Sequence, residues 1–327
     1  PDYDLVIIGG GSAAFAAALK ASELGKQVLM INDGLPLGGT CVNVGCVPSK
    51  TLIRTAEAFH HTRHTAFASI TTGGSALDFK EAIRQKRELV DSLRNAKYIN
   101  IIQDDPRVKV LKGRARLVGT NSVAVNGATF SARYILIATG SSTYVPDIRG
   151  IDTVPYLTHE SLYELDNLPE HVIIIGGRYI ALENAQMLAR LGSKVTLLQR
   201  SHRILPEEMP DVTGTLTEYL KAEGIEVKTD VAVQSVAMAG KRIIVNATVG
   251  GEEQTIEGSH LLIATGRKGN TKSLGLEELS VATHGKGFVV TDDFLRTTVP
   301  TIFAAGDVTG RHLFVYTAAY EGALAVE

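Results

Sequence analysis

An internal repeat constrains the fold of this 327-residue chain more than any other feature. The segment DLVIIGGGSAAFAAALKASELGKQVLMIN, from Asp4 to Asn32, is matched at one constant offset by HVIIIGGRYIALENAQMLARLGSKVTLLQ, from His171 to Gln199. Each copy has an apolar run, a glycine-rich turn, an Ala/Leu-rich run that ends in Leu-Gly, and a second apolar run. This order predicts a strand, a turn, a helix and a second strand, which is the βαβ unit of a dinucleotide-binding fold. The chain should therefore hold two nucleotides.

A second pair of similar segments supports the same plan. YILIATGSS covers residues 134–142, and HLLIATGRK covers residues 260–268. Each predicts a buried strand that runs into a Thr-Gly turn. Each follows a β-prone stretch, residues 108–125 and 226–256, for which we predict a small antiparallel meander. The predicted fold class is α/β, with two Rossmann-like domains in three layers, each with a small antiparallel β-meander.

Loops near Gly150 and Gly269 are the predicted domain boundaries. Residues 1–150 form the first part of the first nucleotide-binding domain, and residues 151–269 form the second domain. Residues 270–327 are a return segment that completes the first domain.

The first glycine turn has the spacing of a pyrophosphate site. Gly9 permits the tight turn, Gly11 lets the backbone approach a phosphate, and Ala14 allows the helix to pack closely on the strand. The acidic residue expected as a ribose ligand is displaced, because Asn32 occupies its usual place and Asp33 comes next. Both are candidate ribose ligands.

The second glycine turn departs from this pattern, because Arg178 stands where the second glycine belongs. Two interpretations remain open: Arg178 contacts a phosphate, or it is simply an exposed arginine at a helix start. After the next strand, Gln199 stands where an acid would select NAD. The arginines that follow suit a 2′-phosphate, which favours NADPH over NADH. The candidate ligands of this nucleotide are Gly176, Gly177, Arg178, Tyr179, Ile180, Arg200, Arg203 and Gly266.

The only two cysteines, Cys41 and Cys46, lie in GGTCVNVGCVPSK, residues 38–50. Because proline is favoured in a first helical turn, Pro48 predicts that Cys46 lies at a helix N-terminus, where the helix dipole stabilises a thiolate. Lys50, one turn further on, adds positive charge. We predict that Cys46 has the lower pKa, and that Cys41 lies on the loop before this helix.

Three interpretations of the cysteine pair are open. A disulfide that closes so short a loop stabilises little through chain entropy, and a static one is hard to maintain in a reducing compartment. A structural zinc site needs about four ligands, so the cysteines would have to recruit histidines such as His60 and His64. The interpretation we favour is a redox pair that opens and closes during turnover.

Composition and net charge limit the kinds of partner that we expect for this protein. Hydrophobic residues make up 44% of the chain and charged residues 21%, as in a soluble globular enzyme. The net charge of −2 gives no electrostatic footprint for nucleic acid or an anionic membrane. The apolar run from Leu5 to Leu19 lacks the basic flank and cleavage pattern of a signal peptide. We expect a small-molecule substrate, no nucleic acid, no membrane and a cytoplasmic location.

The chain resembles the flavin-dependent pyridine nucleotide-disulfide oxidoreductases. The resemblance rests on residues 38–50, both glycine turns, both ATG strands and TIFAAGDVTG at residues 301–310, and it covers essentially the whole chain. It implies that the first βαβ unit binds FAD and the second binds NAD(P)H. It also implies that the cysteines form a disulfide beside the flavin, with Cys46 contacting the flavin and Cys41 meeting the substrate.

The same resemblance assigns roles to individual residues. Tyr179 would be the lid over the flavin at the nicotinamide site, Glu183 would pair with Lys50 near the flavin, and Asp307 would hydrogen-bond the flavin ribitol. The candidate catalytic residues are Cys41, Cys46, Lys50, Tyr179 and Glu183. The candidate FAD ligands are Gly9, Gly11, Ser12, Ala13, Ala14, Asn32, Asp33, Gly39, Thr40, Ala115, Thr139, Gly140, Ser141, Arg267, Gly306 and Asp307.

Within the family, GTCVNVGCVPSK, LLQRS and LFVYTAA at residues 313–319 are most similar to the mercuric ion reductases. Electrons would pass from NADPH through FAD to the Cys41–Cys46 disulfide and on to Hg(II), giving Hg(0). Thiolates are the preferred ligands of soft metals, so both cysteines are the candidate ligands of the Hg(II) substrate. The alternatives are another disulfide reductase, similar to dihydrolipoamide dehydrogenase or glutathione reductase, a flavin oxidoreductase without a thiol relay, and an inactive FAD- and metal-binding fragment.

The chain departs from the family at its end. It stops at Glu327 inside a helix-like run, before the region where the family has its dimer-interface domain. The resemblance implies a homodimer, but we expect the dimerisation domain to be absent from this sequence. The His-Glu acid-base pair and the C-terminal cysteine pair that the resemblance places there would be absent as well.

Overall fold

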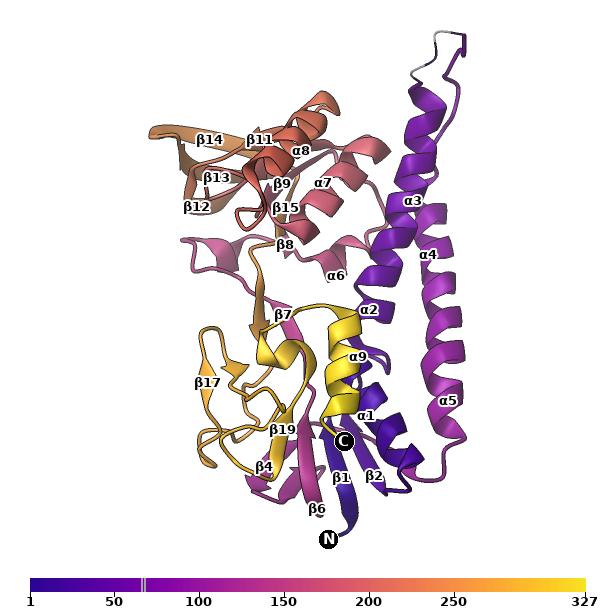
Figure 1. The fold of residues 1–327 in the computed structure, drawn as a ribbon. Helices are drawn as coiled ribbons and strands as arrows, with labels where there is room; N and C mark the ends of the chain where they lie inside the picture. The colour runs from indigo at the N-terminus through magenta and orange to yellow at the C-terminus, as the bar shows by residue number, and fades with distance from the viewer. Residues whose placement is uncertain (66, 68) are drawn as a thin grey trace. The chain divides into compact units, whose positions relative to one another are not determined.

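The structure, a computed structural model, describes residues 1–65, 67 and 69–327. The chain forms two compact units (Figure 1). The first contains Pro1–Cys46, Leu89–Ser142 and Arg267–Glu327, and the second contains Val47–Glu88 and Thr143–Gly266. Helices α3 (Cys46–Arg63) and α4 (Phe79–Arg94) contribute residues to both. No helix of the described residues is both long and apolar enough to cross a membrane.

The first unit is built on a seven-stranded sheet. Its strands are β1 (Tyr3–Ile8), β2 (Val28–Asn32), β3 (Val108–Lys112), β4 (Arg116–Gly119), β5 (Ser122–Val125), β6 (Ala128–Ile137) and β19 (Ile302–Ala304). The order is β3-β2-β1-β6-β5-β4, with β19 paired to β6. β1, β2, β3, β6 and β19 pair in parallel, whereas β4, β5 and β6 pair antiparallel.

Shorter elements complete this unit. The helices are α1 (Ser12–Glu23), α2 (Gly39–Asn43), a π-helix (Asn95–Ile99), α5 (Asn100–Gln103), a 3-10 helix (Gly306–Thr309) and α9 (Val315–Leu324). The two-stranded pairs are β7 (Ser141–Thr143) with β16 (Arg267–Gly269), and β17 (Thr283–His284) with β18 (Phe288–Val289). The helix-like run at the end of the sequence is therefore helical, as α9.

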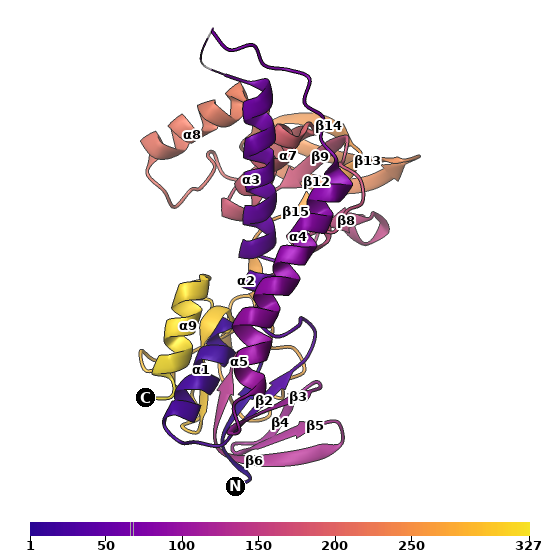
Figure 2. The same cartoon turned by 90° about the vertical axis from the view of Figure 1, so that its right-hand side faces the viewer.

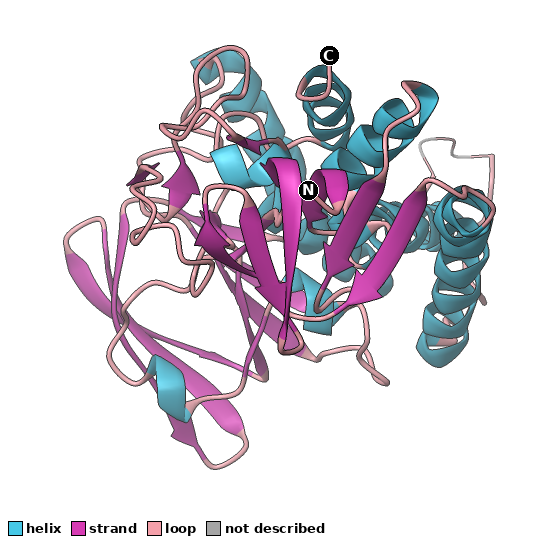
Figure 3. Ribbon diagram, turned by 90° about the horizontal axis from the view of Figure 1, so that it is seen from below, coloured by secondary structure: helices cyan, strands magenta, loops and turns pink. Residues whose placement is uncertain are grey.

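Alternate residues of β1 face two different hydrophobic cores. Leu5 and Ile7 pack with α1 and α9, and the helices lie on one side of the strands (Figures 2 and 3). Val6 and Ile8 pack with β4, β5 and the return segment. Because both faces of the parallel sheet are covered, its strands are continuously apolar rather than alternating. This is the three-layer arrangement predicted for the domain.

The second unit repeats the plan. Its strands are β8 (Tyr156–Leu157), β9 (His171–Ile175), β10 (Lys194–Leu198), β11 (Glu226–Lys228), β12 (Val231–Ala239), β13 (Arg242–Val249), β14 (Glu252–Gly258) and β15 (His260–Ile263). The helices are a 3-10 helix (Ile151–Thr153), α6 (His159–Leu162), α7 (Tyr179–Leu191) and α8 (Pro210–Ala222). A parallel sheet has the order β11-β10-β9-β15-β8, and β12-β13-β14 form a separate antiparallel sheet.

Both predicted meanders exist, but each begins one strand later than the predicted stretch. β3 pairs in parallel with β2, and β11 pairs in parallel with β10. Each of these strands follows a helical segment, and a strand that returns through a helical crossover is placed parallel to the preceding one. The antiparallel pairing starts only at β4 and at β12.

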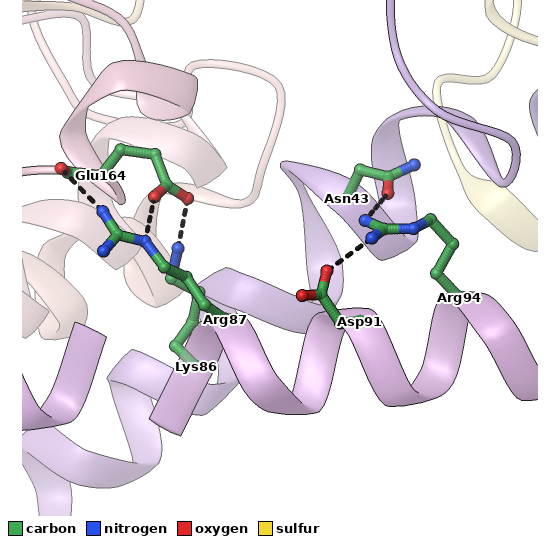
Figure 4. Close-up of polar contacts among 6 residues, drawn as sticks. All are labelled: Asn43, Lys86, Arg87, Asp91, Arg94 and Glu164. Carbon is green, nitrogen blue, oxygen red and sulfur yellow. Dashed lines mark hydrogen bonds and ion pairs between the residues drawn. The ribbon is translucent and has the colours of Figure 1, made fainter. Parts of the chain in front are cut away.

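Residues 47–88 pack in the second unit, although the predicted first domain covers residues 1–150. Leu52 of α3 and Ile83 of α4 belong to the hydrophobic core that contains α7. Lys86 is 1% exposed and forms an ion pair with Glu164, to which Arg87 Nε also donates at 2.7 Å (Figure 4). Packing units and nucleotide-binding domains need not coincide, so the predicted domain boundaries stay a prediction.

Candidate functional site

The first glycine turn leaves the start of α1 bare. Gly9 has φ 133°, and a Cβ at this residue would overlap the carbonyl oxygen of Ala138. Gly11 is the N-cap residue of α1, and a Cβ on Gly39 would lie 2.6 Å from Gly11 Cα. The two backbones therefore meet without side chains between them. N–H groups at such a helix start hold phosphates, so the turn fits the pyrophosphate of a dinucleotide.

A buried hydroxyl beside this turn also fits a ligand. Thr139 Oγ1 is buried and has no hydrogen-bond partner among the residues that the structure describes. Buried polar atoms without a partner are rare in folded proteins and costly. A polar group of a bound FAD would remove that cost.

A chain of hydrogen bonds orients Asp307. Ser141 Oγ donates to Asp307 Oδ2 at 2.8 Å, and Arg267 Nε donates to Ser141 Oγ at 2.6 Å. Gly306 N donates to Glu321 Oε2 of α9 at 2.7 Å. Burial raises the pKa of Glu321. The structure thus brings together three candidate FAD residues that are far apart in sequence, and α9 holds the turn that carries Asp307.

The other candidate FAD residues differ in what they offer a ligand. Asn32 Nδ2 donates to Leu35 O at 2.9 Å, so part of its amide is used within the protein. Asp33 is exposed. Ala115 is 4% exposed and belongs to the hydrophobic core, so only its backbone is suited to a ligand. The remaining candidates lie at the start of α1, in α2 and in the Thr-Gly turn: Ser12, Ala13, Ala14, Thr40 and Gly140.

The cysteine segment begins with a short helix. Gly38 has φ 98° and precedes α2, and Cys41 lies in the middle of α2, half-buried. The prediction that Cys41 lies on a loop is wrong. Gly38 can adopt the left-handed conformation, and the chain can therefore enter a helical turn directly after it.

Asn43 fixes α2, and sequence analysis missed it. Its Nδ2 donates to the carbonyl oxygens of Pro36, Leu37 and Gly39 at 3.0, 3.3 and 2.8 Å. Its Oδ1 accepts a hydrogen bond from Arg94 Nη1 at 3.0 Å (Figure 4). The only sequence signal is a polar residue between the two cysteines, which is 8% exposed in the structure.

Helix α3 begins at Cys46, as Pro48 predicted, and Cys46 is exposed. The helix extends to Arg63. The positive end of the helix dipole favours a thiolate at this position. Lys50 follows in the next turn. The local structure therefore suits the predicted role of Cys46 as the thiol with the lower pKa.

Tyr98, which sequence analysis also missed, lies beside the cysteine segment. It belongs to the π-helix, and its ring would be 3.1 Å from a Cβ on Gly38. Burial raises the pKa of Tyr98, a hydrogen bond with Ser12 lowers it, and Cys41 and Cys46 raise it slightly. π-Helical turns are frequent at functional sites. No local pattern in the sequence connects this tyrosine to the cysteines.

Within the second unit, Lys50 and Glu183 form an ion pair. Lys50 Nζ lies 2.6 and 2.7 Å from the two carboxylate oxygens of Glu183. The side chains are 57% and 40% exposed, so water screens the pair. α3 and α7 thus bring together the two residues that the family resemblance pairs.

At the second glycine turn, an acidic segment, residues 206–208, contacts the start of α7. Gly176 has φ 134°, and Arg178 is the N-cap residue of α7. Arg178 forms an ion pair with Glu207. The hydroxyl of Tyr179 donates to Glu208, which raises the pKa of Tyr179. Arg178 is therefore exposed at a helix start, but its guanidinium group is held by a carboxylate.

The two arginines after β10, Arg200 and Arg203, differ in exposure and in their hydrogen bonds. Arg203 Nη2 donates to Pro206 O at 2.8 Å, and Arg203 Nε is buried with no partner among the described residues. Arg200 is exposed. Gln199 Nε2 donates to Arg203 O at 3.3 Å, which shapes this turn. Arg200 is therefore the more exposed of these two candidate ligands. The remaining candidates of this nucleotide, Gly177, Ile180 and Gly266, lie in the same unit.

The predicted sites divide between the units. The candidate FAD ligands and both cysteines lie in the first unit, and the candidate NADPH ligands lie in the second with Lys50, Tyr179 and Glu183. His60 and His64, the histidines considered for a zinc site, stack with ring centroids 4.3 Å apart and planes at 16°. Among the described residues, no group of three or more His, Cys, Asp and Glu side chains is arranged to hold a metal ion.

Comparison with known proteins decides the family. The sequence pattern described as pyridine nucleotide-disulphide oxidoreductase matches residues 3–322. The chain belongs to this family. It is 44% identical to a mercuric reductase of Bacillus cereus over 99% of this chain and 51% of that protein. It is 44% identical to a mercuric reductase of Streptomyces lividans over 99% of this chain and 69% of that protein.

A solved structure is similar over the same range. The HOCl-induced flavoprotein disulfide reductase RclA from Escherichia coli has a TM-score of 0.87 and 33% identity, and the match covers 98% of this chain and 69% of that chain. This chain therefore spans only part of its relatives, down to 51% of the Bacillus cereus protein.

Family membership confirms the predicted family and the predicted α/β fold class. Members of this family use FAD and NAD(P)H, which confirms the cofactor prediction at that level and supports the class of FAD-dependent oxidoreductase. The preference for NADPH, the individual ligands and the acceptor stay predictions.

Proposed function

We propose that this chain is the electron-transfer part of a flavoprotein that takes electrons from NADPH and delivers them through a Cys41–Cys46 disulfide to Hg(II). One observation carries the proposal: Cys46 begins α3 and Cys41 lies in α2, in the same unit as the bare glycine turn. Relatives between 39% and 44% identical that are named mercuric reductases support Hg(II) as the acceptor.

The cofactors would be held by the residues described above. In the proposal, residues 1–150 and 270–327 hold FAD, with Thr139 and Asp307 offering polar groups, and residues 151–269 hold NADPH. When bound, FAD supplies the chemistry that converts a hydride from the nicotinamide into an electron pair for a disulfide. The homodimer that the family resemblance implies is part of the proposal for the whole protein.

The chain's own residues would handle the electron pair and the acceptor. Two electrons break the S–S bond, and the helix start at α3 holds Cys46 as a thiolate. Cys41, half-exposed, meets the acceptor. Two thiolates suit a soft metal ion such as Hg(II). Transfer of the electron pair to Hg(II) forms the disulfide again and releases Hg(0), so the overall reaction is NADPH + Hg(II) → NADP⁺ + H⁺ + Hg(0).

A second acceptor class has support from one relative. The solved structures include a Cu(II) complex of the flavoprotein disulfide reductase from Escherichia coli, 33% identical to this chain. The same thiol pair could pass electrons to Cu(II) or to an organic disulfide. The choice of acceptor therefore needs a direct comparison.

The test measures NADPH oxidation by the FAD-loaded protein with Hg(II) in excess thiol, with Cu(II), with oxidised glutathione and with lipoamide. The proposal predicts the highest rate with Hg(II), and loss of that rate in Cys41→Ser and Cys46→Ser. Thr51→Ala, in the same helix as Cys46, is the control that keeps the rate. A higher rate with an organic disulfide or with Cu(II) would overturn the choice of acceptor. FAD absorbance and NADP⁺ binding, measured in parallel, distinguish a nucleotide-binding chain without turnover from one that binds neither.

A further inference from the structure

The internal repeat continues past the βαβ units into the segments that follow β2 and β10. Gly38 N donates to Gly10 O at 2.8 Å, and Leu205 N donates to Gly177 O at 2.9 Å. The two bonds are related by the same offset as the two repeat copies. Gly38 has φ 98° and Leu205 has φ 42°. A left-handed leucine is rare and strained, so the second copy keeps this turn at an energetic cost.

The two copies differ in what they place at the helix start. In the first copy, the residue after the turn is Gly39, which packs on the backbone of Gly11 and leaves the start of α1 bare. In the second copy, Arg178 takes the position of Gly11, and the segment after Leu205 brings Glu207 to its guanidinium group. One copy thus presents backbone N–H groups, and the other presents an arginine already paired with a carboxylate.

Buried neighbours and hydrogen bonds hold the acidic segment in the second unit. Ile204 is completely buried and Leu205 is 6% exposed. Glu208 N donates to Leu205 O at 2.9 Å, and Arg203 Nη2 donates to Pro206 O at 2.8 Å. The carboxylate of Glu208 accepts from Tyr179, beside Arg178. The fold therefore sets the backbone position of the acidic residues beside the start of α7.

A phosphate and a carboxylate compete for the same guanidinium group, because both form charge-assisted hydrogen bonds with it. We propose that Glu207 sets the affinity of the nicotinamide nucleotide, its carboxylate holding Arg178 until a phosphate group of the nucleotide replaces it. This inference rests on the proposed NADPH site in the second unit. It makes Arg178 a phosphate ligand that is masked in the nucleotide-free protein.

The magnitude follows from the exposure of the pair. The Arg178 and Glu207 side chains are 58% and 54% exposed. An exposed ion pair contributes little free energy. In water, removing one unit charge near a bound ligand changes the binding free energy by about 1 kcal/mol or less. Glu207→Gln should therefore lower the Kd of NADP⁺ by about two- to fivefold.

The experiment is calorimetric titration of the FAD-loaded protein with NADP⁺, with thermal unfolding of each variant as a check of the fold. Glu207→Gln should bind more tightly than the parent protein. Glu218→Gln is the matched control, because it removes the same charge from an exposed ion pair on α8, with Lys221. Its Kd should equal that of the parent protein. Unchanged or weaker binding by Glu207→Gln would overturn the proposal.

A double-mutant cycle tests whether Glu207 acts through Arg178. In an Arg178→Gln background, Glu207→Gln should change the Kd by clearly less than it does with Arg178 present. An equal effect in both backgrounds would show simple charge repulsion and contradict the masking of Arg178. Failure of every variant, and of the parent protein, to bind NADP⁺ would instead contradict the proposed nucleotide site itself.

Discussion

Lys50 Nζ lies 2.6 Å from Glu183 Oε1, so an ion pair joins α3 to α7. α3 is the helix that begins at Cys46, and α7 is the helix of the second glycine turn. The pair is exposed enough for water to screen it. Its contribution to folding is therefore small, and the role of Lys50 near a bound flavin stays a prediction.

The Lys50 ammonium should matter more for electron transfer than for stability. Lys50→Met should change the free energy of unfolding by less than about 1 kcal/mol, and it should slow reduction of the bound flavin by NADPH about tenfold or more, as removal of a positioned charge does. Glu183→Gln should have a smaller effect, because the ammonium remains. Urea unfolding and stopped-flow absorbance measure the two quantities. Flavin reduction at the parent rate in Lys50→Met would contradict the assigned role.

Asn43 should be the main support of α2. Asn43→Ala removes hydrogen bonds to Pro36, Leu37 and Gly39 and leaves buried groups unpaired, so it should lower the free energy of unfolding by about 2–3 kcal/mol. It should also speed the reaction of Cys41 with a thiol reagent. Urea unfolding and the rate of thiol modification test both effects.

The control for this prediction is Asp91→Asn. Asp91 pairs with Arg94 at 2.5 Å but is 61% exposed (Figure 4). Its loss should change stability by less than about 0.5 kcal/mol. Equal stability of Asn43→Ala and the parent protein would show that α2 is held by other contacts.

Gly39 should be required for FAD binding because of its contact with Gly11. A Cβ at Gly39 would lie 2.6 Å from Gly11 Cα, and Gly39 has φ 62°. Gly39→Ala should therefore purify with little or no FAD. Gly34→Ala is the matched control, because Gly34 also has a positive φ, 82°, but a Cβ there meets no atom within 4 Å. A full complement of FAD in Gly39→Ala would show that the close contact of the turns does not form the site.

Glu321 should make the first unit less stable as the pH rises. Burial raises the pKa of Glu321, so the folded state binds this proton more tightly than the unfolded state. The resulting stabilisation is complete at acidic pH and is lost as the pH rises from the usual range of a glutamate through the raised pKa. Glu321→Gln keeps an oxygen to accept from Gly306 N. Its stability relative to the parent protein should therefore increase with pH across that range, as urea unfolding at several pH values would show.

Glu164 is the control for this prediction, because its pKa is shifted in the opposite direction. Burial raises its pKa, but hydrogen bonds from Lys86 and Arg87 outweigh that effect and lower it. Its stabilisation is therefore present at neutral pH and is lost as the pH falls. Glu164→Gln should be less stable than the parent protein at neutral pH, and the difference should shrink in acid. A Glu321→Gln variant whose pH dependence matched that of Glu164→Gln would refute the argument.

The sequence predicted those parts of the fold that have a local pattern. The strand, glycine turn and helix of each repeat are recognisable because Gly9 and Gly176 need a conformation that other residues avoid. Pro48 likewise marked the start of α3. The pairing of β3 with β2 was missed because the choice between a parallel and an antiparallel neighbour depends on the crossover, not on the residues of the strand.

The residues that the sequence did not reveal are those whose role depends on a distant partner. Asn43 Oδ1 accepts a hydrogen bond from Arg94, far along the chain, and Tyr98 lies beside Gly38. In the sequence, Glu207 is an acidic residue with no recognisable partner. The fold places it beside Arg178. In each case a long stretch of chain, whose path is set by packing, separates the partners.

The central claim is that electrons from the nicotinamide reach the Cys41–Cys46 pair. It is tested most directly by anaerobic titration of the oxidised, FAD-loaded protein with NADPH, with reactive thiols counted after each addition. We predict a gain of two thiols for each NADPH consumed, together with a long-wavelength absorption band between thiolate and flavin, and the loss of both in Cys46→Ser. Consumption of NADPH with reduction of the flavin but no gain in thiols would contradict the claim.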